Sequence, residues 1–329
     1  MLGMADALRS VKQGAENPVE RNRMLERSAI YIVLCLVFVV ASIVSPVFLK
    51  ERNIMNVIRQ AAILGVVATG QTFAILAGGI DLSVASVIAF MSIMSANLMA
   101  GRNEMFLPVT ALCLGISVVI GLMNGLFVTR LKIAPFIATL AMGLIVQGVR
   151  FIYCNGIPKG SIPDNLRFFG RGMVLHIPVP VLLCVAGALI AWTLLKLTTF
   201  GRGVYASGGS LRTAHLSGVE VDKVRIITYV LSSLWAGIAG LILTGYIGFA
   251  DNWLGRGYDL NSIAAVVIGG TAMSGGKGSV WGSLAGALMT WIMFNIVLLI
   301  GLDVDAQRIV KGVVIIFAVS LYARLNRRE

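Results

Sequence analysis

Long apolar runs separated by short polar segments dominate the chain, a pattern typical of a protein that crosses a membrane many times. Most runs approach the length of about 20 residues that a helix needs to span the hydrocarbon core. The pattern therefore predicts an all-α polytopic membrane protein with about ten transmembrane helices. The expected spans are 28–48, 54–77, 82–100, 106–129, 134–154, 179–197, 226–248, 260–271, 280–301 and 309–323.

The eighth run, Leu260 to Thr271, is too short to cross a bilayer by itself. We expect either that this helix extends into its flanks or that it is broken inside the bundle. The 37 glycines of the chain are in keeping with broken helices and with close packing between helices.

Composition and charge agree with a membrane protein. The 329 residues are 57% hydrophobic and 13% charged, with a mean hydropathy of +0.89, whereas a soluble domain carries about 25% charged residues. In a soluble protein the net charge of +12 would suggest nucleic acid as a partner. Here the basic residues lie mainly in loops on one side of the predicted bundle, so the charge does not indicate nucleic acid.

The distribution of Lys and Arg predicts the orientation of the chain. Predicted inside segments hold 16 of these residues and outside loops hold seven, while four more lie near the outer ends of spans. By the positive-inside rule, cytoplasmic tails at 1–27 and 324–329 flank a transmembrane domain at 28–323. Loop 198–225 is then cytoplasmic, and loop 155–178 is the best place for an extracytoplasmic partner.

The two halves of the chain resemble each other at four places, in the same order. Residues 75–78, 79–83, 121–125 and 145–149 match residues 242–245, 257–261, 282–286 and 309–313. Under the predicted topology the second span runs inward and the seventh runs outward. Spans two to five and seven to ten therefore form a predicted inverted repeat, an arrangement typical of transporters with alternating access.

The polar loop between the halves predicts a short exposed helix. Ser210 can cap its first turn, and Gly218 can end it about two turns later. A soluble partner can bind such a helix on the cytoplasmic side. The segment consists of Gly208, Gly209, Ser210, Leu211, Arg212, Thr213, Ala214, His215, Leu216, Ser217 and Gly218.

Two carboxylates occupy equivalent repeat positions. Asp81 and Asp259 each lie near the start of a span, where ion coupling and helix capping are both open, and we favour capping. The glycine-rich run 275–278 lacks the spacing of a phosphate-binding loop, so we expect no nucleotide site in this chain. The two histidines, His176 and His215, do not indicate a metal site.

Polar residues inside the predicted spans could line a path for a hydroxylated solute, although most such residues bond neighbouring helices. The Gly-x-x-x-Gly pairs at 121–125 and 282–286 predict close helix contacts. The candidate path residues are Gln71, Asn97, Asn124, Thr139, Gln147 and Asn295.

Three stretches together resemble the membrane permease of bacterial ABC importers of the ribose and other monosaccharide class. They are Leu76 to Ser83, the central loop from Phe200 to Val219, and Ile263 to Gly278. The resemblance implies a permease of the bacterial inner membrane with no cofactor or ATPase activity of its own. It also implies as partners a second permease copy, a cytoplasmic ABC ATPase, a periplasmic sugar-binding protein and the surrounding lipid.

The resemblance assigns roles to two regions. The segment from Gly208 to Gly218 is similar to the family's ATPase-coupling loop, although Ser210 and the pair Thr213-Ala214 stand where the family commonly has Asn and Ala-Ala. Ser can cap a helix as Asn does, so we expect coupling to be retained. We expect the binding protein to dock on the outer side at Arg52, Arg167, Arg171 and Arg256.

The solute and the driving force remain open at this point. Ribose, xylose, galactose, a polyol and a sugar-derived signal such as autoinducer-2 all fit the resemblance, and a homodimer is favoured over pairing with a sister permease. The alternative function is a secondary transporter driven by an ion gradient, which would use Asp81 or Asp259.

Overall fold

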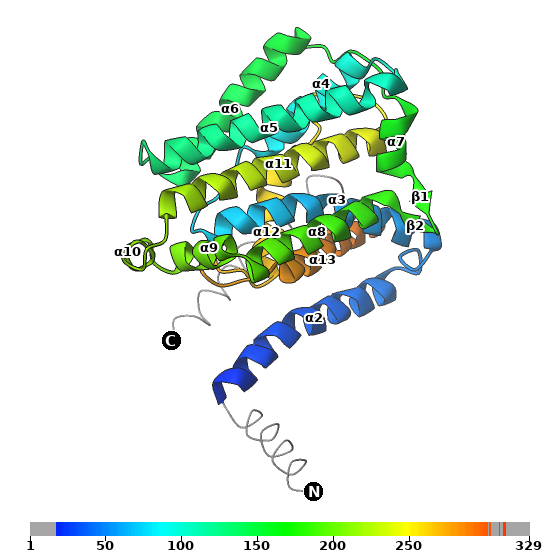
Figure 1. Ribbon diagram of the computed structural model, residues 1–329. Coiled ribbons are helices and arrows are strands. Elements are labelled where there is room, and N and C mark those ends of the chain that lie inside the picture. Colours follow the sequence, from blue (N-terminus) through cyan, green and yellow to red (C-terminus); the bar gives the residue numbers. More distant parts are fainter. Residues whose placement is uncertain (1–17, 302, 304–308, 310–311, 314–329) are drawn as a thin grey trace, which may run out of the picture.

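The computed structural model describes residues 18–301, 303, 309 and 312–313. These residues form a helical bundle with one short two-stranded hairpin (Figure 1). The helices are α2 (Pro18–Val44), α3 (Glu51–Leu76), α4 (Val84–Met99), α5 (Phe106–Thr129), α6 (Pro135–Cys154), α7 (Asp164–Arg171), α8 (Val179–Leu197), α9 (Thr199–Gly209), α10 (Leu211–Leu216), α11 (Val221–Ile247), α12 (Tyr258–Ile268) and α13 (Val280–Leu299). A 3-10 turn at Asn103–Met105 precedes α5, and strands β1 (Met173–Val174) and β2 (Ile177–Pro178) pair antiparallel.

The all-α class is confirmed, whereas the number of spans stays a prediction. Within the described residues, six helices are long and apolar enough to cross a bilayer: α3, α5 with its preceding turn, α6, α8, α11 and α13. Three shorter apolar helices, at Ile30–Val44, Val84–Met99 and Tyr258–Ile268, fall on other expected spans. The tenth span, apart from single positions, the tail 324–329 and residues 1–17 of the predicted tail 1–27 lie outside the described residues, and α2 already begins at Pro18.

The eighth apolar run forms a short helix that ends within the bundle. Helix α12 has 11 residues and is about 16 Å long, roughly half the hydrocarbon thickness. Its end is followed by Gly269 and Gly270, and Gly270 has the left-handed φ of 81° that glycine adopts without strain. Of the two alternatives for this run, the structure therefore supports a broken span.

Helices α3 and α11 form the centre of the bundle. In the most apolar stretch of α3, 83% of the residues are buried, against 28% in the corresponding stretch of α5. Helix α11 packs on α3, α4, α5 and α7, and α3 also packs on α8, α12 and α13. The outer helices α5, α6 and α8 leave most of their residues at least partly exposed, as expected where lipid is the solvent.

Glycines bring the helix backbones into contact, as the two Gly-x-x-x-Gly pairs predict. A Cβ atom at Gly121 would lie 2.6 Å from the carbonyl oxygen of Tyr229 on α11. On α13, a Cβ atom at Gly286 would lie 1.9 Å from the carbonyl oxygen of Ala265 on α12. These separations are shorter than van der Waals contact, so a larger residue would force the helices apart.

The two ends of the bundle carry different elements. Figure 1 shows α10 and the end of α9 at one end, and α7 with the hairpin β1–β2 at the opposite end. The start of α3 lies with α7 and the hairpin, since Arg59 donates to the carbonyl oxygen of Arg171. The predicted cytoplasmic loop and the predicted outer loop are thus separated by the length of the helices.

We predict that Gly121→Ala destabilises the protein, because the added methyl group meets the backbone of α11. The expected loss is about 1–3 kcal/mol, the usual cost of overpacking, seen as a lower Tm in detergent. Gly115→Ala on the same helix is the matched control, because nothing lies within 4 Å of its added Cβ atom. Equal Tm values for the two variants would contradict the prediction.

Candidate functional site

Helix α10 is the short exposed helix that the central loop predicts. The hydroxyl of Ser210 accepts a hydrogen bond from the backbone N–H of Thr213 at 3.3 Å, which caps the first turn. The helix ends at Leu216, and Gly218 follows with a left-handed φ of 80° while its N–H donates to the carbonyl of His215. The predicted cap and stop residues are therefore confirmed.

The side chains of α10 point mostly away from the bundle. Leu211 is 47% exposed and Leu216 is 79% exposed, whereas Ala214 is buried. Arg212 and His215 are also exposed. Two exposed leucines beside a fixed positive charge form a surface that a soluble protein can cover.

A cluster of buried polar residues surrounds the irregular segment between α3 and α4. Asp81 is fully buried, and its Oδ1 atom accepts hydrogen bonds from the N–H and the hydroxyl of Ser83, at 2.9 and 2.6 Å. The Ser83 hydroxyl in turn accepts from the side-chain amide of Asn124 on α5 at 2.9 Å. These contacts agree with the capping interpretation of Asp81, since the carboxylate binds an N–H just before α4.

Two more candidate path residues complete this cluster. The hydroxyl of Thr139 on α6 accepts from the N–H of Leu82 at 3.1 Å, and its one proton lies within reach of the carbonyls of Pro135 at 2.9 Å and Ile80 at 3.3 Å. The side-chain amide of Gln71 on α3, oriented to satisfy its neighbours, pairs with both backbone groups of Asp81 at 3.1 and 3.2 Å. Gln71 and Thr139 thus hold irregular backbone that would otherwise be unsatisfied inside a membrane protein, and Asn124 holds the Ser83 side chain of the same segment.

The other candidate path residues lie apart from this cluster. Asn97 is exposed and donates to the hydroxyl of Tyr153, and Gln147 is half-buried. Asn295 exchanges two hydrogen bonds of 2.9 Å with Asn53. The six residues therefore do not form one continuous set, and their role in a solute path stays a prediction.

Asp259 does not cap α12 through a hydrogen bond, so the capping prediction is wrong on this point. The N-cap position of α12 is occupied by Gly257, whose φ of 86° is left-handed, and this helix has no side-chain cap. Asp259 lies one residue inside the first turn, where its charge still faces the positive end of the helix dipole. The structural equivalence with Asp81 is therefore only partial.

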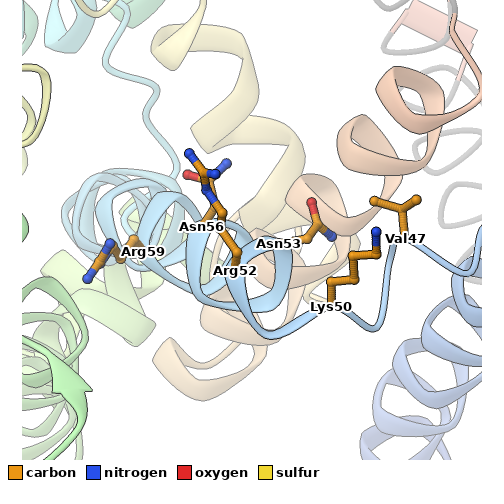
Figure 2. Close-up of a pocket in the computed structure, with 6 residues that line it drawn as sticks. All are labelled: Val47, Lys50, Arg52, Asn53, Asn56 and Arg59. Atoms are coloured by element: carbon orange, nitrogen blue, oxygen red, sulfur yellow. The ribbon is translucent and has the colours of Figure 1, made fainter.

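A polar hollow lies at the end of the bundle opposite α10. Its volume is about 440 Å³, and Figure 2 shows its lining residues around the start of α3: Val47, Lys50, Arg52, Asn53, Asn56 and Arg59. The three cationic side chains create a positive potential in a partly enclosed space. Arg52, Asn56 and Arg59 are spaced by four and three residues, so a helical-face analysis of this span could have grouped them.

The four predicted docking residues have different surroundings. Arg52 lines the hollow, and Arg167 is exposed on α7. The guanidinium of Arg171 donates to the carbonyls of Tyr246 and Ile247, which ties α7 to the end of α11. The guanidinium carbon of Arg256 lies 5.4 Å from the ring centre of Trp253. All four lie away from α10, as the topology predicts, although Arg171 also has a clear structural role.

Comparison with known proteins defines the family. Residues 53–319 match the family of permease components of branched-chain amino acid transport systems. The chain belongs to this permease family. The permease is 40% identical over 313 residues to the ribose import permease RbsC of Bacillus subtilis, which covers 94% of this chain and 96% of the relative.

Other relatives are similar over nearly their whole length. The permease is 37% identical to the ribose import permease RbsC of Escherichia coli K12, covering 90% of this chain and 93% of the relative. It is 33% identical to the galactose/methyl galactoside import permease MglC of Salmonella typhimurium, covering 91% of this chain and 96% of the relative. No solved structure matches the permease.

We predict that Asn124→Ala destabilises the permease by about 1–3 kcal/mol, because it removes a buried hydrogen bond and leaves a small cavity between the helices. The change removes the donor to Ser83 in a fully buried position. Asn97→Ala, at an exposed position, should change the free energy of unfolding by less than about 0.5 kcal/mol. Thermal or denaturant unfolding in detergent measures both; equal effects would show that the cluster does not stabilise the fold.

Proposed function

We propose that this protein is the membrane-spanning permease of an ATP-binding-cassette importer that carries a monosaccharide into a bacterial cell. The observation that carries the proposal is similarity over at least 90% of the chain to relatives named as ribose and galactose import permeases. The exposed helix α10 and the polar hollow at the other end supply surfaces for the two soluble partners that such an importer needs.

The proposed energy source is a cytoplasmic ABC ATPase that binds α10. The glycine-rich run 275–278 lacks the phosphate-loop spacing, so this segment does not supply a nucleotide site. The exposed leucines of α10 and the basic residue between them give an ATPase a compact apolar contact with polar edges. ATP binding on the partner would then shift the permease between inward-open and outward-open states.

We predict that the double variant Leu211→Asp, Leu216→Asp no longer binds the ATPase, because each change buries a charge in the proposed contact. ATPase co-purification and ATP-dependent uptake should fall by about tenfold or more, while the Tm of the isolated permease stays unchanged because both side chains are exposed. Leu131→Asp, at another exposed leucine of the same end, is the control. Wild-type uptake by the double variant would exclude α10 as the contact.

The proposed docking surface for the periplasmic sugar-binding protein is the outer end of the bundle. Arg52 at the hollow, with Arg167 and Arg256 exposed nearby in the outer segments, offers positive charge to an acidic partner. Helix α7 and the hairpin, both inside the predicted outer loop 155–178, extend this surface. In this orientation both termini are cytoplasmic.

We predict that Arg52→Glu weakens binding of the loaded sugar-binding protein by about tenfold, because charge reversal repels an acidic partner. The loss should be larger at low ionic strength, since exposed charges are screened by salt. Arg130→Glu, an exposed arginine near the inner end of α5, should leave this affinity unchanged. Equal affinities for both variants, measured with the permease in nanodiscs, would contradict the proposed surface.

We further propose that two permease copies form the solute path, with alternating access produced by the predicted inverted repeat. An ion-coupled secondary transporter is not favoured, because the relatives are named as import permeases of sugars and one of them as an ABC transporter permease. Reconstitution of the permease with its ATPase and binding protein tests the function. ATP-dependent uptake of labelled ribose, galactose or arabinose is the expected result; uptake driven by a proton gradient without ATP would overturn it.

A further inference from the structure

Three distant segments of the chain meet at one point on the α10 side of the bundle. They are the end of α3 with the residues after it, the end of α9, and the loop between α12 and α13. Their contacts are made by backbone atoms of Leu76, Gly78, Gly208, Gly275 and Gly276. We call this set the glycine junction. The same three segments carry the family resemblance in the sequence.

The centre of the glycine junction is the carbonyl of Leu76, the last residue of α3. As a C-terminal carbonyl it has no partner inside its own helix, and it accepts a hydrogen bond from the N–H of Gly276 at 3.0 Å. Gly208 lies against the same pair. A Cβ atom at Gly208 would lie 1.8 Å from the Leu76 oxygen and 2.4 Å from the Gly276 nitrogen. Both separations are far below contact distance, so this position of α9 requires glycine.

The other side of the glycine junction is equally close. Gly275 has a left-handed φ of 88°, and a Cβ atom there would lie 2.9 Å from both the Gly78 nitrogen and the Gly208 Cα. The hydroxyl of Tyr205 on α9 donates to the carbonyl of Gly278 at 3.1 Å, which adds a side-chain tie between α9 and the same loop. Because backbone meets backbone with no side chain between, these segments have little room to slide past one another.

The glycine junction lies between α10 and the buried polar cluster. On one side, only Gly209 and Ser210 separate Gly208 from the first residue of α10. On the other side, the chain after Leu76 leads within six to seven residues to Leu82 and Ser83, which contact Thr139 on α6 and Asn124 on α5. A displacement of α10 is thus passed through Gly208 to the end of α3 and to the segment that the cluster holds.

We infer that Gly208 is a positioning residue for energy coupling, because it joins α10 and the inner end of α3 into one unit that moves together. The inference rests on the proposed function, in which an ATPase moves α10. It adds that the force is transmitted through the glycine junction to α3, the central helix of the bundle. A methyl group at Gly208 would push α9 away from Leu76 and let α10 move without α3.

The test uses Gly208→Ala in the complex of permease, ATPase and binding protein, reconstituted in liposomes. The exposed face of α10 is unchanged, so the ATPase should still co-purify and hydrolyse ATP. We expect the number of ATP molecules hydrolysed per sugar imported to rise by about tenfold or more, since the two motions are no longer joined. Gly115→Ala, whose added Cβ atom has no atom within 4 Å, should keep the wild-type ratio of ATP hydrolysed to sugar imported.

Two results would overturn the inference. One is a Gly208→Ala complex with the wild-type ratio; the other is a parallel fall of hydrolysis and import that leaves the ratio unchanged. Failure of the proposed function is distinguishable, because then the wild-type permease itself would neither bind the ATPase nor import sugar.

A measurement on the wild-type complex decides the matter even if Gly208→Ala does not assemble. Hydrogen exchange of the Gly276 amide reports directly on its bond to Leu76. A junction that moves as one unit predicts equal protection of this amide in the nucleotide-free and the ATP-bound complex. An increase of about tenfold or more on ATP binding would show that the junction opens, which contradicts the inference.

Discussion

Backbone polar groups inside a membrane protein must find partners within the protein, and this constraint shapes the whole bundle. Regular helices satisfy it by themselves, but this chain has irregular segments at 77–83 and 269–278. Gln71 and Thr139 bind the first segment, and Gly276 supplies the donor for the buried carbonyl of Leu76, which has no partner within α3. Each irregular segment thus has at least one contact with a part of the chain that is distant in sequence, through Thr139 for the first and Leu76 for the second.

The same constraint explains why glycine and small polar residues are concentrated at the centre. A buried backbone group can be reached only if the neighbouring chain comes very close, and at Gly208 and Gly286 a side chain would prevent that approach. The result is a bundle whose α10 end is tied to its core by backbone contacts. The opposite end is tied by Arg171, which binds the last carbonyls of α11. Two fixed ends on a packed core are compatible with the proposed docking of soluble partners on both sides.

Much of the fold could be predicted from the sequence because apolar run length and helix stop signals are local properties. Six of the expected spans, the capped helix at Ser210 and the packing at Gly121 follow from such signals. The polar residues were harder. The sequence predicts Gln71, Asn124 and Thr139 as candidates for a solute path, yet their contacts with the segment 80–83 depend on how four helices pack.

The contacts of the glycine junction could not be predicted from the sequence, for a related reason. The run 275–278 could be shown not to fit a phosphate loop, but its neighbours lie about 70 and 200 residues earlier in the chain. Likewise, the hydrogen bonding of Asp259 was predicted wrongly because its position relative to the N-cap depends on the turn at Gly257. Contacts between distant segments are set by packing, which a single sequence does not display.

The most direct test of the account is the side of the membrane that α10 faces. Leu216→Cys and Leu175→Cys place single thiols at exposed positions on opposite ends of the bundle, in a background where Cys35 is replaced by serine. A membrane-impermeant maleimide should label Leu175→Cys in intact spheroplasts and Leu216→Cys only in inverted vesicles. Labelling of Leu216→Cys from outside the cell would place α10 away from any cytoplasmic ATPase and would contradict the proposed mechanism.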